Sequence, residues 1–222
     1  MLEHIHVVTI SKSEQAHLAK FFPERTIDYI PFGVDTQFWK PAPDGPVTRK
    51  FVLAIGNDAN RDWKTLVEAW DETMPPLKIV TNLPVPIAAP NVEVIRGDWR
   101  KQTLSDQEIL KLYQQALCVV IPLRNTIQPA GQSVCLQAMA CGRPVVMSDI
   151  AGLWDRTHFV DGQHWWLPPP EAALSLRKTV ENVRLRVGSV GISTGINARE
   201  IVKKEFSTTK MCSSIGNLLS SI

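Results

Sequence analysis

Two kinds of apolar pattern alternate along this chain. Continuous apolar runs predict strands covered on both faces, whereas apolar residues three or four positions apart predict helices with one buried side. The runs that predict strands lie at residues 5–10, 27–31, 51–55, 77–81, 92–95, 117–121, 144–147 and 164–167. Helical spacing or capping signals lie at residues 11–22, 63–70, 105–116, 131–141, 171–183 and 198–205, and in the tail after residue 209.

This alternation predicts an α/β fold, a Rossmann-like parallel sheet with helices on both faces, because parallel strands need crossover connections. Three prolines and a glycine within residues 40–49 mark a linker. We therefore expect a short N-terminal βα unit with its linker at residues 1–40 and the Rossmann-like domain at residues 45–183. Residues 184–222 are expected to form C-terminal helices that pack back toward the N-terminal unit.

Composition narrows the class of protein. The chain has 222 residues, 44% hydrophobic and 21% charged, with a net charge of +2, so it has no strong attraction to nucleic acid or acidic lipid. No apolar run approaches the ~20 residues of a membrane span, and the N-terminus lacks a secretory pattern. The four cysteines lack C-x-x-C spacing. We expect reduced thiols in a cytoplasmic protein.

The segment at residues 128–148 carries the most specific chemical signal. Gly131 opens a predicted helix, and a helix start directs unpaired N–H groups and a positive dipole end into one small space. The N–H groups of Gly131, Gln132 and Ser133 suit a phosphate. Gln137 shares a helix face with Ser133, which indicates a nucleotide or nucleotide-sugar site. An ordinary buried helix between two strands is the alternative interpretation.

A glycine loop joins the first clean apolar strand to the next helix. Gly56 permits a sharp turn and the close approach of a ligand. Arg61 can offer a bidentate fork to a diphosphate, with Lys64 as a nearby point charge. The alternative is a polar loop in which Asn60 or Asp62 caps the helix.

Ligand sites in parallel sheets lie at the carboxyl ends of the strands, and three candidate loops leave those ends. The third, residues 97–100, could pack against the flat face of a nucleotide base or form a surface turn. The five histidines show no metal-ligand spacing, and no Asp-x-Asp pair follows a strand. We therefore predict no bound metal and no cofactor.

Taken together, these segments resemble the C-terminal half of a family 4 retaining glycosyltransferase, which has the GT-B architecture of two Rossmann-like domains. Gln137-Ala-Met-Ala-Cys-Gly-Arg-Pro-Val-Val146 matches the Glu-Ala-Met-Ala-Cys-Gly-x-Pro-Val helix and strand of that family. The other similar segments are residues 9–14, 30–38, 55–69, 161–170 and 198–207.

The resemblance implies transfer of a sugar from a nucleotide-diphosphate sugar to an acceptor, with retention and without a metal. The donor diphosphate would be held by the glycine loop, through Gly56, Asn57, Arg61 and Lys64. Some positions depart from the family pattern. Gln137 stands where a glutamate usually binds the ribose hydroxyls. Gln137 is at the second of two family glutamates; Pro129 takes the place of the first, for which Gln128 would serve, and Asn57 stands where arginine is frequent.

By the same resemblance, residues 1–40 are a remnant of the family's first domain, which supplies the acceptor site. We assign no catalytic residue in this chain and expect the chain to be incomplete or inactive alone. A non-catalytic nucleotide-sugar-binding subunit, paired with a separate N-terminal acceptor domain or with a second copy, is the main alternative. A sugar-nucleotide epimerase of the same two-domain architecture is a further one.

Overall fold

A computed structural model describes residues 6–43, 50–86, 89–97, 103–186 and 190–221. Its body is a five-stranded parallel sheet with the strand order β5-β4-β3-β6-β7. The strands are β3 (Phe51–Ile55), β4 (Leu77–Val80), β5 (Val92–Ile95), β6 (Ala116–Ile121) and β7 (Val145–Met147). At the centre, Leu53 is aligned with Lys78 of β4 and with Val119 of β6. The predicted α/β fold class is confirmed.

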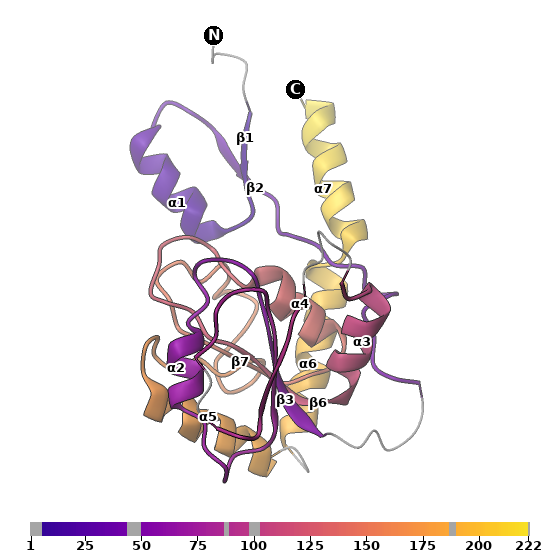
Figure 1. Ribbon diagram of the computed structural model, residues 1–222. Helices are drawn as coiled ribbons and strands as arrows, with labels where there is room; N and C mark the ends of the chain where they lie inside the picture. The colour runs from indigo at the N-terminus through magenta and orange to yellow at the C-terminus, as the bar shows by residue number, and fades with distance from the viewer. Residues whose placement is uncertain (1–5, 44–49, 87–88, 98–102, 187–189, 222) are drawn as a thin grey trace.

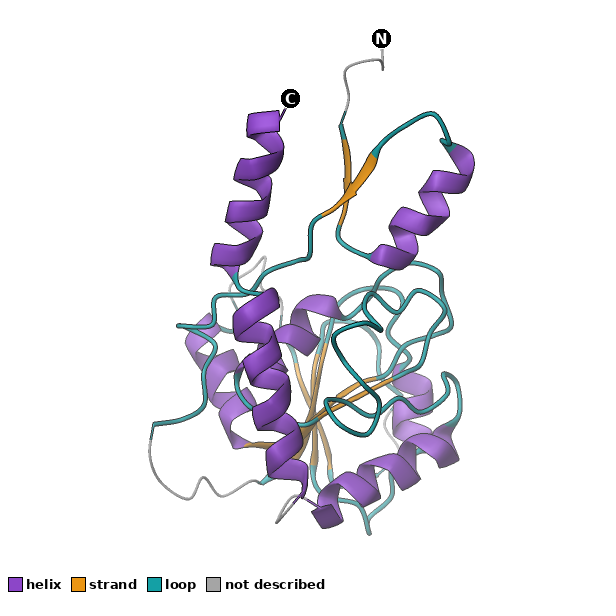
Figure 2. Cartoon of the chain, turned by 180° about the vertical axis from the view of Figure 1, so that it is seen from behind, coloured by secondary structure: helices purple, strands orange, loops and turns teal. Residues whose placement is uncertain are grey.

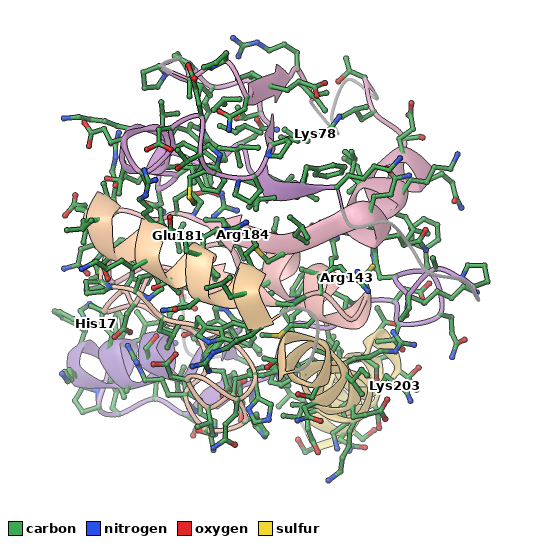
Figure 3. All side chains as sticks on the ribbon, turned by 90° about the horizontal axis from the view of Figure 1, so that it is seen from below. His17, Lys78, Arg143, Glu181, Arg184 and Lys203 are labelled. Carbon is green, nitrogen blue, oxygen red and sulfur yellow. The ribbon has the colours of Figure 1, made fainter. Side chains whose placement is uncertain are left out.

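Helices cover both faces of this sheet because neighbouring strand residues point to opposite sides. On one face, Phe51 and Leu53 of β3 pack in a single core with side chains of α3 (Asp106–Gln115), α4 (Gln132–Ala140) and α6 (Val190–Glu205). On the other face, Val52 and Ala54 pack with α2 (Trp63–Glu68) and α5 (Ala173–Arg186). Figure 2 shows α6 lying along the body, and Figure 3 shows α5, with Glu181 and Arg184, crossing the lower end.

A smaller unit precedes the sheet. Strands β1 (Val7–Thr9) and β2 (Ile27–Tyr29) pair in parallel, and α1 (Lys12–Phe21) connects them. This unit and the last helix, α7 (Thr208–Ser221), project from the same side of the body (Figure 1). The backbone of Val34 pairs with that of Phe206 and Thr208. The C-terminal helices are thereby joined to the segment that follows the N-terminal unit.

Two expected elements differ from the structure. Residues 164–167 form isolated bridges, from Trp166 to Val146 and from Trp165 to Asp161, instead of a strand, and a turn with positive φ at Gly162 comes just before them. Helix α6 begins at Val190, earlier than expected from its glycines and serines. A Cβ at Gly195 would lie 2.3 Å from the Gly142 carbonyl oxygen, so this glycine lets α6 approach the end of α4. Tertiary contact here outweighs helix propensity.

Some expectations concern residues outside the described part of the chain. The segment proposed to pack against a base falls in residues 98–100, and most of the linker falls in residues 44–49. Among the described residues, no helix is both long and apolar enough to cross a membrane.

Candidate functional site

The strand order reverses between β3 and β6, and the loops that follow these two strands meet there. In open parallel sheets this reversal creates a crevice at the carboxyl ends of the strands. The β3–α2 loop carries Arg61, and the β6–α4 connection ends at Gly131. A Cβ at Gly56 would lie 1.8 Å from Arg61 Nε, and a Cβ at Gly131 would lie 3.0 Å from Arg61 Nη1. The guanidinium group of Arg61 therefore lies between two glycines from the two loops.

Arg61 is an incompletely paired buried cation. Its side chain is 2% exposed, and its Nε and Nη1 atoms have no hydrogen-bond partner among the described residues. The nearest charged oxygen is Asp58 Oδ2, 3.4 Å from Nε. Burial lowers the pKa of Arg61, and Asp58 opposes that shift. A guanidinium group in this position has unused donors for an incoming anion.

The start of α4 adds further donors. Gly131 precedes the helix with φ 72°, and no side chain caps it. The first helical hydrogen bond runs from the Cys135 N–H to the Gly131 carbonyl oxygen, at 2.9 Å. The N–H groups at the start of the helix thus lack the partners that interior N–H groups have. Together with Arg61, they form a compact positive region.

A cavity of about 750 Å³ opens at this edge of the sheet. Its walls come from the loops after β3, β4 and β5, from α3 and α4, and from the segment before β3. It is lined by Trp39, Ile55, Gly56, Asn57, Asp58, Arg61, Val80, Asn82, Leu83, Gly97, Leu104, Asp106, Ile109, Ser133, Val134 and Gln137. Five predicted site residues are therefore brought together in one cavity: Gly56, Asn57, Arg61, Ser133 and Gln137.

Two of these side chains already have partners. Asn57 donates to the Gly97 carbonyl oxygen at 2.9 Å and accepts from Thr81 and from the Asn82 N–H, so its side chain joins three strand ends. Tyr113, which is fully buried, donates its hydroxyl to Gln137 Oε1 at 3.1 Å. Burial also raises the pKa of Tyr113, which keeps the hydroxyl protonated. This bond directs the Gln137 carbonyl toward Tyr113 and leaves its amide N–H groups for a ligand.

The remaining four predicted residues do not line the cavity. Lys64 lies on the exposed side of α2, 3.8 Å from Glu68. Gln128 is exposed in the loop before α4. Gln132 is buried and donates to the Ile10 carbonyl oxygen at 3.1 Å, which ties α4 to the N-terminal unit. Gly131 is adjacent to the Arg61 guanidinium group but is not itself one of the residues that line the cavity.

Some residues of the cavity wall were not predicted from the sequence. Asp58 and Asp106 place carboxylates there, and Trp39 adds an aromatic side chain. Asp58 could have been found, since it belongs to the same glycine loop as Arg61. Trp39 carried no local signal, because it reaches the cavity from a segment outside the sheet.

No metal-binding cluster of three or more His, Cys, Asp or Glu side chains is present in the described part of the chain. All four cysteines are free thiols, as expected. Burial raises the pKa of Cys118 and of Cys141 to about 12, so these two are unreactive at neutral pH.

Residues 50–183, more than half of the chain, match the family model described as Glycosyl transferases group 1. The chain belongs to this family. The match covers the whole five-stranded sheet and the loops that line the cavity. No curated protein matches this chain significantly in sequence.

Solved structures share the fold. Sucrose-phosphate synthase from Thermosynechococcus elongatus superposes with a TM-score of 0.79 at 21% identity, covering 97% of this chain and 57% of the other. A glycosyltransferase from Rickettsia africae superposes with a TM-score of 0.79 at 16% identity, covering 98% of this chain and 63% of the other. Anabaena HepE in complex with UDP and glucose superposes with a TM-score of 0.75 at 17% identity, covering 98% of this chain and 63% of the other. The group 1 chain thus spans about three fifths of the length of these proteins.

Proposed function

We propose that this chain is the donor-binding half of a sugar transferase and that its cavity holds the diphosphate of a nucleotide sugar. The observation that carries this proposal is the buried Arg61 guanidinium group, which has unpaired donors and lies beside the start of α4. Membership of the Glycosyl transferases group 1 family supports it. So does the similarity to HepE, whose structure contains UDP and glucose.

The proposed chemistry needs electrostatic stabilisation more than a nucleophile from this chain. When the bond between the anomeric carbon and the diphosphate oxygen breaks, the electron pair stays on the diphosphate. Arg61 and the N–H groups at the start of α4 would stabilise that charge without a metal ion. An acceptor hydroxyl, bound by another domain, would form the new glycosidic bond and give up its proton to the departing diphosphate. Retention of anomeric configuration is part of the proposal by resemblance.

The remaining polar side chains of the wall would orient the nucleotide. Ser133 lies on the first turn of α4, and the Gln137 amide, one turn further, would donate to the ribose hydroxyls. Asn57 would act mainly through its backbone, because its side chain joins the strand ends.

Isothermal titration calorimetry with UDP tests the proposal. Wild type should bind UDP, and Arg61→Ala should bind about tenfold or more weakly, because a hydrogen bond to a charged group contributes ~1.5–3 kcal/mol. Lys64→Ala is the matched control, since it removes one positive charge from an exposed side chain outside the cavity. Equal losses for the two variants would reduce the role of Arg61 to general charge attraction, and unchanged affinity in Arg61→Ala would remove it from the site.

A second candidate is a nucleotide-sugar-binding subunit that lacks an acceptor domain and pairs with a separate one or with a second copy. The exposure of apolar side chains on the N-terminal unit, at Val8, Ile10, Phe21 and Phe22, favours such a partner. UDP-glucose incubated with the purified chain separates the two functions. Release of UDP by the chain alone favours the transferase, whereas dimerisation in solution or co-purification with a second chain favours the subunit.

A further inference from the structure

Asp58 is held against Arg61 by the glycine loop itself. Its Oδ1 atom accepts from the Asn60 N–H at 3.1 Å, and its backbone carbonyl accepts from the Arg61 N–H at 3.2 Å. These bonds leave Oδ2 at 3.4 Å from Arg61 Nε. The Asp58 side chain is 41% exposed and lines the cavity, so it lies on the side from which a ligand would approach.

The charges of the cavity wall are unusual for an anion site. Among the described lining residues, Arg61 is the one cation, whereas Asp58 and Asp106 are both acidic. Lys64, whose positive charge could have offset these two carboxylates, faces solvent near Glu68. An incoming diphosphate would therefore meet, among the described residues of the wall, a buried guanidinium group that already has a carboxylate beside it.

We propose that Asp58 is a built-in counter-ion of Arg61 that stabilises the empty site and competes with the ligand for the guanidinium group. This inference rests on the proposed function, because it concerns the same anion site. In the empty chain, Asp58 reduces the cost of burying the Arg61 charge. Once a diphosphate binds, the same carboxylate becomes a like-charged neighbour that weakens binding.

The contrary interpretation is that Asp58 serves only as a loop cap for the Asn60 N–H. Asp58→Asn separates the two roles, since asparagine keeps the oxygen that accepts this bond and loses the charge. Asp106→Asn is the matched control. It removes the same charge from another part of the cavity wall, at the first residue of α3, and no ion pair joins it to Arg61.

The experiment measures the melting temperature without ligand and the dissociation constants for UDP and for inorganic pyrophosphate. Asp58→Asn should melt below wild type when empty and should bind both anions roughly three- to tenfold more tightly, the effect expected of one partly screened charge nearby. Asp106→Asn should change affinity less, and its melting temperature should fall only by the small amount expected from losing a negative charge in the first turn of α3. If Asp58→Asn does not fold, Asp58→Ser retains an acceptor and replaces it.

The affinities of the variants for the two anions test the counter-ion role and the nucleotide function separately. Unchanged or weaker anion binding by Asp58→Asn overturns the counter-ion role while leaving the nucleotide site standing, provided that wild type binds UDP. An equal gain in anion affinity in Asp58→Asn and Asp106→Asn overturns it too, because the gain would then follow from removing any negative charge from the cavity wall. Tighter pyrophosphate binding by Asp58→Asn with no UDP binding by any variant supports the counter-ion and overturns the nucleotide function. No binding of either anion by any variant overturns both.

Discussion

At the scale of single residues, the site depends on Arg61 fitting between two positions that lack a Cβ. Gly56 belongs to the same loop, but Gly131 lies far along the chain, at the start of α4. With φ 72° at Gly131, the backbone also adopts a conformation that other residues reach only with strain. The geometry of the proposed anion site therefore depends on glycine at both positions.

Gly131→Ala tests this dependence. The new methyl group would lie 2.7 Å from Ile121 Cγ2 and 3.0 Å from Arg61 Nη1, so we expect lower stability and a displaced guanidinium group. UDP affinity measured by calorimetry should fall about tenfold, comparable with the loss of one charged hydrogen bond. Gly162→Ala is the control. It has a similar positive φ, 75°, but its methyl group would meet nothing within 4 Å, so it should lose stability and keep affinity.

At the scale of elements, α5 is attached to the turn after α2 by a polar clamp. Arg177 pairs with both carboxylate oxygens of Asp71 and donates to Thr73 Oγ1 at 2.8 Å. The side-chain hydrogen bond from Arg177 and the bonds from Thr73 hold the pKa of Asp71 well below its usual range. The clamp joins two helices of the same sheet face, away from the cavity.

The clamp predicts an acid-dependent stability. Because the pKa of Asp71 is lower in the folded chain than in the unfolded one, its contribution is present above the ordinary aspartate pKa of about 3.9 and is lost as the pH falls below it. Asp71→Asn should therefore melt below wild type at neutral pH, and the difference between the two melting temperatures should shrink steadily as the pH falls from about 4 toward the lower pKa of folded Asp71. Glu68→Gln is a suitable control, since Glu68 lies on α2 and its ion-pair partner, Lys64, is exposed. A difference that persists unchanged into acid would contradict an ionic clamp.

At the scale of the whole molecule, an aromatic cluster joins the end of α6 to the segment that follows β7. Phe206 stacks on Phe159 with ring centroids 5.2 Å apart and meets Trp154 edge-on at 5.5 Å. Trp165 completes the cluster through Trp154 at 5.7 Å. Next to it, the Phe206 carbonyl oxygen accepts from the Val34 N–H, at the junction of the N- and C-terminal segments.

Phe206→Ala should destabilise the chain strongly, because the side chain is 1% exposed and its removal leaves a cavity among aromatic rings. We expect a loss of about 3–5 kcal/mol in the free energy of unfolding, measured by urea denaturation. Phe206→Leu should lose less, since it retains most of the apolar volume. A loss below about 1 kcal/mol for Phe206→Ala would mean that the cluster carries little of the stability at this junction.

Much of the fold was predictable because it follows from local pattern. The runs at 51–55 and 92–95 form strands with the same bounds, and the helix predicted at residues 105–116 begins at a capping box of Ser105 and Glu108. The start of α6 was less predictable, since Gly195 lies within a helix only because the backbone near Gly142 approaches it closely. Contacts between segments distant in sequence leave little trace in local spacing.

For the candidate site, the sequence by itself determined that polar loops follow the strands of a parallel sheet and that a glycine opens α4. Those features suffice to gather the loops at one edge, because all parallel strands end on the same side. Only the tertiary structure decided that Arg61 points into the crevice whereas Lys64 points to solvent. The physical reason is that the burial and pairing of a charge depend on residues brought close by folding, here Gly131 and Asp58, and not on neighbours in the chain.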